Sequence, residues 1–170
     1  LEQIAAADDY CRNLESRSAT DPRAVRCRLY MQSAPGLTVY DVARARRVAD
    51  SLVSVSAPAD SLLARYTANM FVAATMARVS AGAPAMKDSA RTLIRSSLAS
   101  ATIDKTRDLA LFGAFAHTLL GDQSDAFRLL TEYLAANPPE RRDALRAEPG
   151  WWFQPLKGLD TIARRFPGID

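Results

Sequence analysis

Cys11 and Cys27 are the two cysteines of the chain, and they are the residues whose spacing most directly suggests covalent chemistry. If the segments around them form an antiparallel helical hairpin that turns at about residues 19 to 20, the two thiols lie at matching heights and can face each other. A disulfide then requires Cα atoms within about 7 Å and an oxidising compartment. The alternative is two small buried side chains in a reducing cytoplasm. The expected location is therefore extracytoplasmic if Cys11 and Cys27 are bonded and cytoplasmic otherwise.

His117 is the single histidine, so a catalytic triad, a Cys–His pair or a zinc site would each have to include it. It lies in an apolar helical segment without a cluster of other ligand residues, which favours a hydrogen-bonded structural histidine. No phosphate loop, nucleophile elbow or metal-ligand spacing occurs in the sequence. We therefore expect no enzyme activity, no catalytic residue, no cofactor and no metal. The carboxylates that we interpret as helix caps and solvated side chains are Asp8, Asp9, Asp122, Asp125 and Glu132.

The composition indicates one folded helical domain spanning residues 1–170. Apolar residues make up 48% of the chain, and seven glycines are too few for a turn-rich all-β fold. The 22 basic and 19 acidic residues are interspersed, so the net charge of +3 does not indicate a nucleic-acid partner. No apolar run reaches the ~18 residues that a membrane span needs. The chain begins with Leu1 inside a helical pattern, from which we expect it to be a fragment of a larger protein.

Apolar residues recur at helical spacing along most of the chain, and proline-containing or glycine-containing turns separate the segments. Asp21 followed by Pro22 is a helix start signal, because the carboxylate can cap free N–H groups and proline needs no donor there. The segment from Ser61 to Ser80 is apolar nearly all round, so we expect neighbours on several sides. The predicted helices are 1–18, 22–32, 39–54, 61–80, 85–100, 105–120 and 124–136, followed by short helices at 140–147 and 157–165.

The segment 107–138 has small residues where two helices of a hairpin would cross. Gly113 and Ala114 permit close approach by the first helix, and Ala126 does the same on the second. Gly121 allows the left-handed turn between them, and Pro138 ends the unit. These residues resemble the tetratricopeptide repeat, although His117 and Ala110 stand where the family commonly has an aromatic residue and tryptophan.

The resemblance extends to the organisation of the whole chain. It implies an all-α, right-handed α-solenoid of about three antiparallel helix pairs, at 21–56, 60–101 and 105–138, preceded by an N-terminal helix. The tail is similar to the capping segment of bacterial tetratricopeptide arrays, at 140–166, which keeps the terminal repeat soluble. The residues that carry this second similarity are Phe153, Pro155, Leu156 and Phe166, with Trp151 and Phe153 covering the last repeat.

A solenoid of this family implies a concave face that binds a protein or peptide. The candidate groove residues on the third pair are Asp108, Leu111, Phe115 and Thr118. The alternative for the two large apolar members, Leu111 and Phe115, is burial beneath a neighbouring helix. The groove lacks the lysine and asparagine arrangement with which chaperone-binding members hold a terminal carboxylate.

Two functions follow from these expectations. The first is a protein-interaction or scaffold module, the accessory or sensory region of a larger bacterial protein, with partner identity and oligomeric state left open. The second is a small-molecule-binding helical domain of a regulatory protein, with an enclosed pocket containing convergent polar groups. Trp151 and Trp152 could form an aromatic cage around a ligand, and the alternative is ordinary packing in the core. The pocket of the second function would lie near Tyr66, Met70, Phe112 and Phe115.

Overall fold

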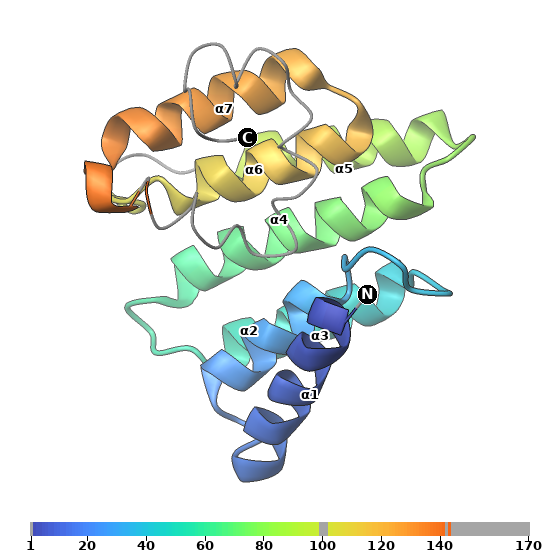
Figure 1. The fold of residues 1–170 in the computed structure, drawn as a ribbon, viewed down its shortest axis with the longest axis vertical. Coiled ribbons are helices and arrows are strands. Elements are labelled where there is room, and N and C mark those ends of the chain that lie inside the picture. The colour runs from blue at the N-terminus through green and yellow to red at the C-terminus, as the bar shows by residue number, and fades with distance from the viewer. Residues whose placement is uncertain (1, 99–101, 142, 144–170) are drawn as a thin grey trace.

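The computed structural model describes residues 2–98, 102–141 and 143, and this part of the chain forms α-helices and no β-strand (Figure 1). The predicted all-α class is therefore confirmed. The helices are α1 (Glu2–Arg17), α2 (Pro22–Met31), α3 (Val42–Val55), α4 (Ser61–Val79), α5 (Pro84–Ser97), α6 (Asp108–Leu120) and α7 (Gln123–Ala136).

Helix α4 is the centre of the fold. It packs against α3, α5 and α6, and Figure 1 shows it between the α2–α3 layer and the α6–α7 layer. Its residues from Met70 to Ala77 are all buried, as expected for a helix that is apolar nearly all round. The main hydrophobic core is built around this helix and includes Phe71 and Phe115, which are 1% and 0% exposed.

Aspartate side chains determine where α2 and α3 begin. The Asp21 carboxylate accepts a hydrogen bond from the backbone N–H of Arg23 at 2.8 Å, as predicted for the start of α2. The Asp41 carboxylate accepts from the backbone N–H of Arg44 at 2.9 Å. This second cap starts α3 at Val42, three residues later than the predicted start at Val39.

Helix α6 also begins later than predicted, at Asp108 rather than at residue 105. The buried Asp104 carboxylate accepts hydrogen bonds from the backbone N–H groups of Asp108 at 3.0 Å and Leu109 at 2.9 Å. Arg107 between them adopts a left-handed conformation with φ of 55°. The chain therefore turns over residues 104–107, and the cap satisfies two of the free N–H groups at the helix start.

Helices α6 and α7 form the close-packed antiparallel hairpin expected for residues 107–138 (Figure 1). Gly121 makes the turn with φ of 81°. A Cβ atom at Gly113 would lie 3.0 Å from Cδ1 of Leu129 on α7, so the absence of a side chain permits this approach. Ala114 and Ala126 are completely buried at the same interface.

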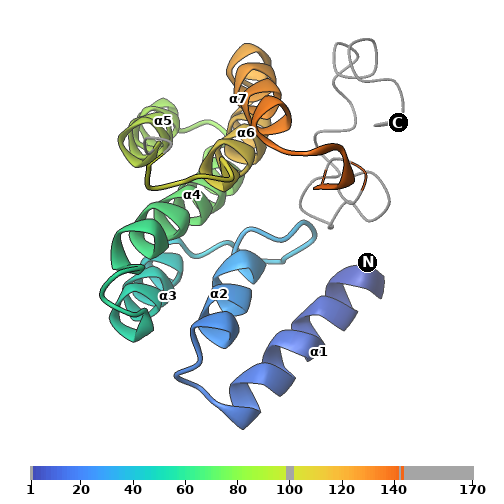
Figure 2. The same ribbon diagram turned by 90° about the vertical axis from the view of Figure 1, so that its left-hand side faces the viewer.

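The other predicted pairs are also adjacent in space, because α2 packs against α3 and α4 packs against α5. Residues 99–101 of the second pair lie outside the described residues. The N-terminal helix α1 packs chiefly against α2 and lies at the edge of the molecule (Figure 2). Within residues 2–98, 102–141 and 143, no helix is long and apolar enough to cross a membrane.

Candidate functional site

A pocket of about 240 Å³ lies where α2, α4 and α6 meet. Each of the three predicted helix pairs contributes its first helix to the lining. The residues that give the pocket its chemical character are Arg26 and Tyr30 from α2, Leu63 from α4, Asp108 and Phe112 from α6, and Asp104 before it. The pocket therefore combines aromatic, aliphatic and charged groups from segments far apart in the sequence.

The aromatic rings of Tyr30 and Phe112 form one wall of this pocket, and the ring of Phe71 continues this aromatic cluster into the core. The ring of Tyr30 stacks on Phe71 with centroids 4.0 Å apart, and Phe112 lies 6.0 Å from Tyr30 and 5.1 Å from Phe71. Such offset and tilted arrangements are the favourable ones for aromatic rings. Burial raises the pKa of the Tyr30 hydroxyl to about 12, so this wall stays uncharged at neutral pH.

Some charged groups around the pocket already form hydrogen bonds within the protein, and others do not. The Asp108 carboxylate accepts hydrogen bonds from Nη2 of Arg141 at 2.8 and 3.1 Å. Asp104 caps α6 through both oxygens. Arg26 and Asp60 are exposed and make no ion pair with a described residue. Within the described part of the chain, a bound molecule can therefore reach these two charges without displacing an ion pair.

Of the four groove residues predicted on α6, Asp108 alone lines the pocket. Leu111 is 4% exposed and packs in the cluster between α6 and α7, and Phe115 is completely buried in the main core. The Thr118 hydroxyl donates to the Ala114 carbonyl at 2.9 Å. Phe115 lies on the same face of α6 as Asp108 and Phe112, but deeper in the core around α4, and Leu111 packs with residues of α7.

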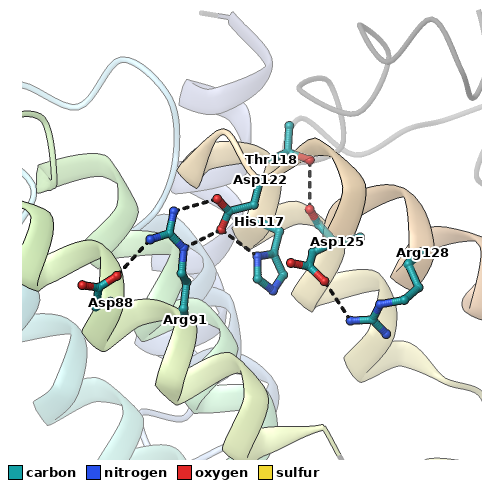
Figure 3. Close-up of polar contacts among 8 residues, drawn as sticks. Asp88, Arg91, His117, Thr118, Asp122, Asp125 and Arg128 are labelled. Carbon is teal, nitrogen blue, oxygen red and sulfur yellow. Dashed lines mark hydrogen bonds and ion pairs between the residues drawn. The ribbon is translucent and has the colours of Figure 1, made fainter.

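A second polar site lies at the turn between α6 and α7 (Figure 3). The Arg91 guanidinium from α5 donates to both oxygens of Asp122, at 2.8 Å through Nε and at 2.7 Å through Nη2. Asp88 on the same helix accepts from Nη1 of Arg91 at 2.9 Å. The Nδ1 atom of His117 lies 3.1 Å from Oδ2 of Asp122. Figure 3 shows Asp122 between the arginine and the histidine.

The ion pair between Arg91 and Asp122 favours the charged form of both groups. The Arg91 hydrogen bonds are the main cause that lowers the pKa of the Asp122 carboxyl below its usual value, and the bond with His117 contributes further. Asp122 and Asp88 in turn raise the pKa of Arg91. His117 is 4% exposed. The geometry matches the predicted hydrogen-bonded histidine, and Asp122 joins the second helix pair to the third.

The other carboxylates considered as acid or base groups pair with nearby arginines or face solvent. Asp125 accepts from Nη2 of Arg128 at 3.2 Å (Figure 3), and Glu132 forms an ion pair with Arg107. Asp8 pairs with Arg12 one helical turn away, and Asp9 is exposed. In the described part of the chain, no group of three histidine, cysteine, aspartate or glutamate residues could hold a metal ion.

Cys11 and Cys27 form a disulfide between α1 and α2, with their Cα atoms 5.4 Å apart. Of the two alternatives that the sequence left open, the structure has the bonded pair. The disulfide lies in a small separate cluster with Met31 and Ala34, to which Ile4 also contributes. It therefore connects the N-terminal helix to the rest of the fold outside the main core.

The structure places the residues predicted for a small-molecule pocket in different environments. Met70 and Phe115, proposed for a small-molecule pocket, are buried in the core, whereas Phe112 does line a pocket and Tyr66 is partly buried. The predicted cap at 140–166 falls mostly outside the described residues. The individual predicted residues that lie outside them are Trp151, Trp152, Phe153, Pro155, Leu156 and Phe166.

The sequence interpretation missed Arg26, Tyr30 and Asp104. Asp104 had a local signal, because an aspartate four residues before an apolar helical run is a candidate cap. Arg26 and Tyr30 are spaced one helical turn apart and could have been read as one face of α2. Nothing local connects Arg91 with Asp122, because 31 positions separate them in the sequence.

In comparisons with known proteins, no family model, no curated protein and no solved structure matches the chain.

Proposed function

We propose that this chain is a protein-interaction module that binds a segment of a partner protein on the face formed by α2, α4 and α6, and that it acts by binding and not by catalysis. The observation that carries the proposal is the pocket at the junction of these three helices, with its aromatic wall and the exposed Arg26 and Asp60. An aromatic surface edged by exposed charges, such as Arg26 and Asp60, which pair with no described residue, is a typical composition for a protein interface.

The proposal includes the architecture suggested by the sequence resemblance. The three adjacent pairs would be tetratricopeptide-like units of a right-handed solenoid, and α2, α4 and α6 would be the first helices that line its concave side. The packing of α4 against both α3 and α6 supports this reading, because in a stack of repeats each unit contacts its neighbours. The module would form an accessory or sensory region of a larger bacterial protein.

The disulfide between Cys11 and Cys27 supports an extracytoplasmic location for this module, because such bonds persist in oxidising compartments. Alkylation of free thiols in rapidly acidified cells, followed by mass spectrometry, would test this part of the proposal. We expect Cys11 and Cys27 to be protected from alkylation unless a reductant is added first. Full alkylation without reductant would place the protein in a reducing compartment.

The binding proposal is tested with two charge reversals. A partner is first isolated with the wild-type protein and identified by mass spectrometry, and its affinity is then measured for Arg26→Glu and Arg47→Glu. Arg47 on α3 is equally an exposed arginine, but it does not line the pocket. We expect Arg26→Glu to weaken binding and Arg47→Glu to leave it unchanged. Equal affinities for the two variants would exclude this face as the binding surface.

A second candidate is a small-molecule-binding domain, favoured by the same pocket because Tyr30, Arg26 and Asp108 converge on it. The volume of about 240 Å³ is smaller than the roughly 300–1,000 Å³ typical of drug-sized ligand sites. This favours a single side chain of a partner over an enclosed metabolite. Thermal stabilisation by a metabolite that Arg26→Glu abolishes would reverse this preference.

A further inference from the structure

Helix α1 is the least embedded helix of the described residues. It packs chiefly against α2, and the small cluster that it contributes to is separate from the main core around α4. A cleft of about 800 Å³ runs along α1, and its other side is formed by α2, by the segment between α2 and α3, and by the start of α3. Apart from this cluster, an ion pair between Glu15 and Arg28 and the Cys11–Cys27 disulfide hold α1 in place.

The two cysteines of the disulfide differ in their exposure to solvent. Cys11 is 2% exposed and lies among the apolar residues of the cluster, whereas Cys27 is partly exposed on α2. Thiol–disulfide exchange requires a thiolate to reach one sulfur from outside, so access decides which sulfur is attacked.

We propose that the disulfide is an exchangeable clasp that controls whether α1 is attached to the rest of the molecule. The thiolate of a dithiol reductant attacks Sγ of Cys27, the bond between the two protein sulfurs breaks, and its electron pair stays on Sγ of Cys11, which takes up a proton. The second thiol of the reductant then displaces Cys27 as a thiol. The protein disulfide gains two electrons and two protons, and the reductant becomes a disulfide.

Reduction of the Cys11–Cys27 disulfide changes the structure only around α1. The core around α4 draws on α2 to α6 and contains no residue of α1. Release of α1 therefore leaves α2 to α7 folded and uncovers the side of α2 that carries Met31 and Cys27. This surface is apolar and partly covered in the oxidised protein, so the clasp exposes a new apolar patch on reduction.

Hydrogen exchange of the whole chain, measured before and after dithiothreitol, tests the release. We expect amides of residues 2–17 to lose protection on reduction, while amides of α4 and α6 keep theirs. The double variant Cys11→Ser/Cys27→Ser should show the reduced pattern with or without dithiothreitol. Retained protection over residues 2–17 after reduction would overturn the proposal, and so would a loss of protection throughout α2 to α7.

The site of attack is tested separately on the oxidised wild-type protein. Brief treatment with glutathione, acid quenching, alkylation of the freed thiols and peptide mapping locate the mixed disulfide. We expect glutathione predominantly on Cys27 and the alkyl group predominantly on Cys11. The reverse distribution, or an equal one, would contradict the assignment of Cys27 as the attacked residue.

Discussion

The guanidinium of Arg91 on α5 binds both carboxylate oxygens of Asp122, at 2.7 and 2.8 Å, and so joins the second helix pair to the turn of the third. Contacts between the helices α5 and α6 themselves are sparse compared with those inside the α6–α7 hairpin. Two parallel charge-assisted hydrogen bonds fix both distance and orientation. This pair of residues is therefore a specific polar connection between neighbouring helix pairs.

Asp122→Asn should destabilise the protein at pH 7 by about 1 kcal/mol, a value that allows for the solvent around this surface pair. The mutation removes the charge that Arg91 binds but keeps the shape of the side chain. Chemical denaturation at neutral pH measures the change in unfolding free energy. The exposed Asp125→Asn, next to Arg128 on α7, is the control and should have a smaller effect.

The effect of Asp122→Asn should also depend on pH. The pKa of Asp122 is lowered in the folded protein, chiefly by Arg91, so its carboxylate contributes stability above the unfolded-state pKa of about 3.9. That contribution is lost as the pH falls through the lower folded-state value. Unfolding free energies of wild type and variant should therefore converge at strongly acidic pH. A difference that persists unchanged to the lowest measurable pH would contradict the assigned role.

Gly113→Val tests the close packing of the α6–α7 hairpin. The added side chain would collide with Leu129 Cδ1, which lies 3.0 Å from the position of a Cβ atom, and with Ile94 behind it. We expect a loss of about 2 kcal/mol in unfolding free energy, even though valine is a somewhat better helix former than glycine. Ala85→Val at an exposed position of α5 is the control and should cost about 0.6 kcal/mol or less. Similar costs for the two variants would mean that the hairpin is loosely packed.

Asp104→Ala should destabilise the protein by about 1 to 2 kcal/mol, because Asp104 caps two backbone N–H groups at the start of α6. Asp60→Ala provides a matched comparison, since Asp60 occupies the cap position of α4 but accepts no capping hydrogen bond through its side chain. It should change stability by only a few tenths of a kcal/mol. Thermal and chemical denaturation of both variants distinguish a working cap from an aspartate that merely occupies the position.

Tyr30 should ionise with a pKa of about 12, which ultraviolet difference titration of wild type against Tyr30→Phe can measure. Burial is the principal cause, because the charged phenolate loses its hydration. Since the folded pKa is raised, the neutral hydroxyl favours the folded state fully below about pH 10, the unfolded-state value, and this advantage declines as the pH rises towards 12. Ionisation near pH 10 would show that the aromatic wall of the pocket is open to water.

The helices were largely predictable because proline, glycine and aspartate mark their ends, and because α4 is apolar on every side. Helices α3 and α6 begin later than predicted because Asp41 and Asp104 cap their first turns. Whether an aspartate caps a helix depends on the orientation of its carboxylate towards the free N–H groups, which the sequence does not specify. The groove residues on α6 were assigned from the family resemblance and from their spacing along the helix. Spacing does not specify which face of a helix its neighbours cover, so Leu111 was chosen where Phe112 lines the pocket.

The most direct test of the proposed binding face is site-specific photo-crosslinking to the isolated partner. A photoreactive amino acid replaces Arg26 at the pocket in one protein and the exposed Arg47 on α3 in another. We predict a crosslinked partner from position 26 and none from position 47. Crosslinking from position 47 alone would contradict the assignment of the partner to the face formed by α2, α4 and α6.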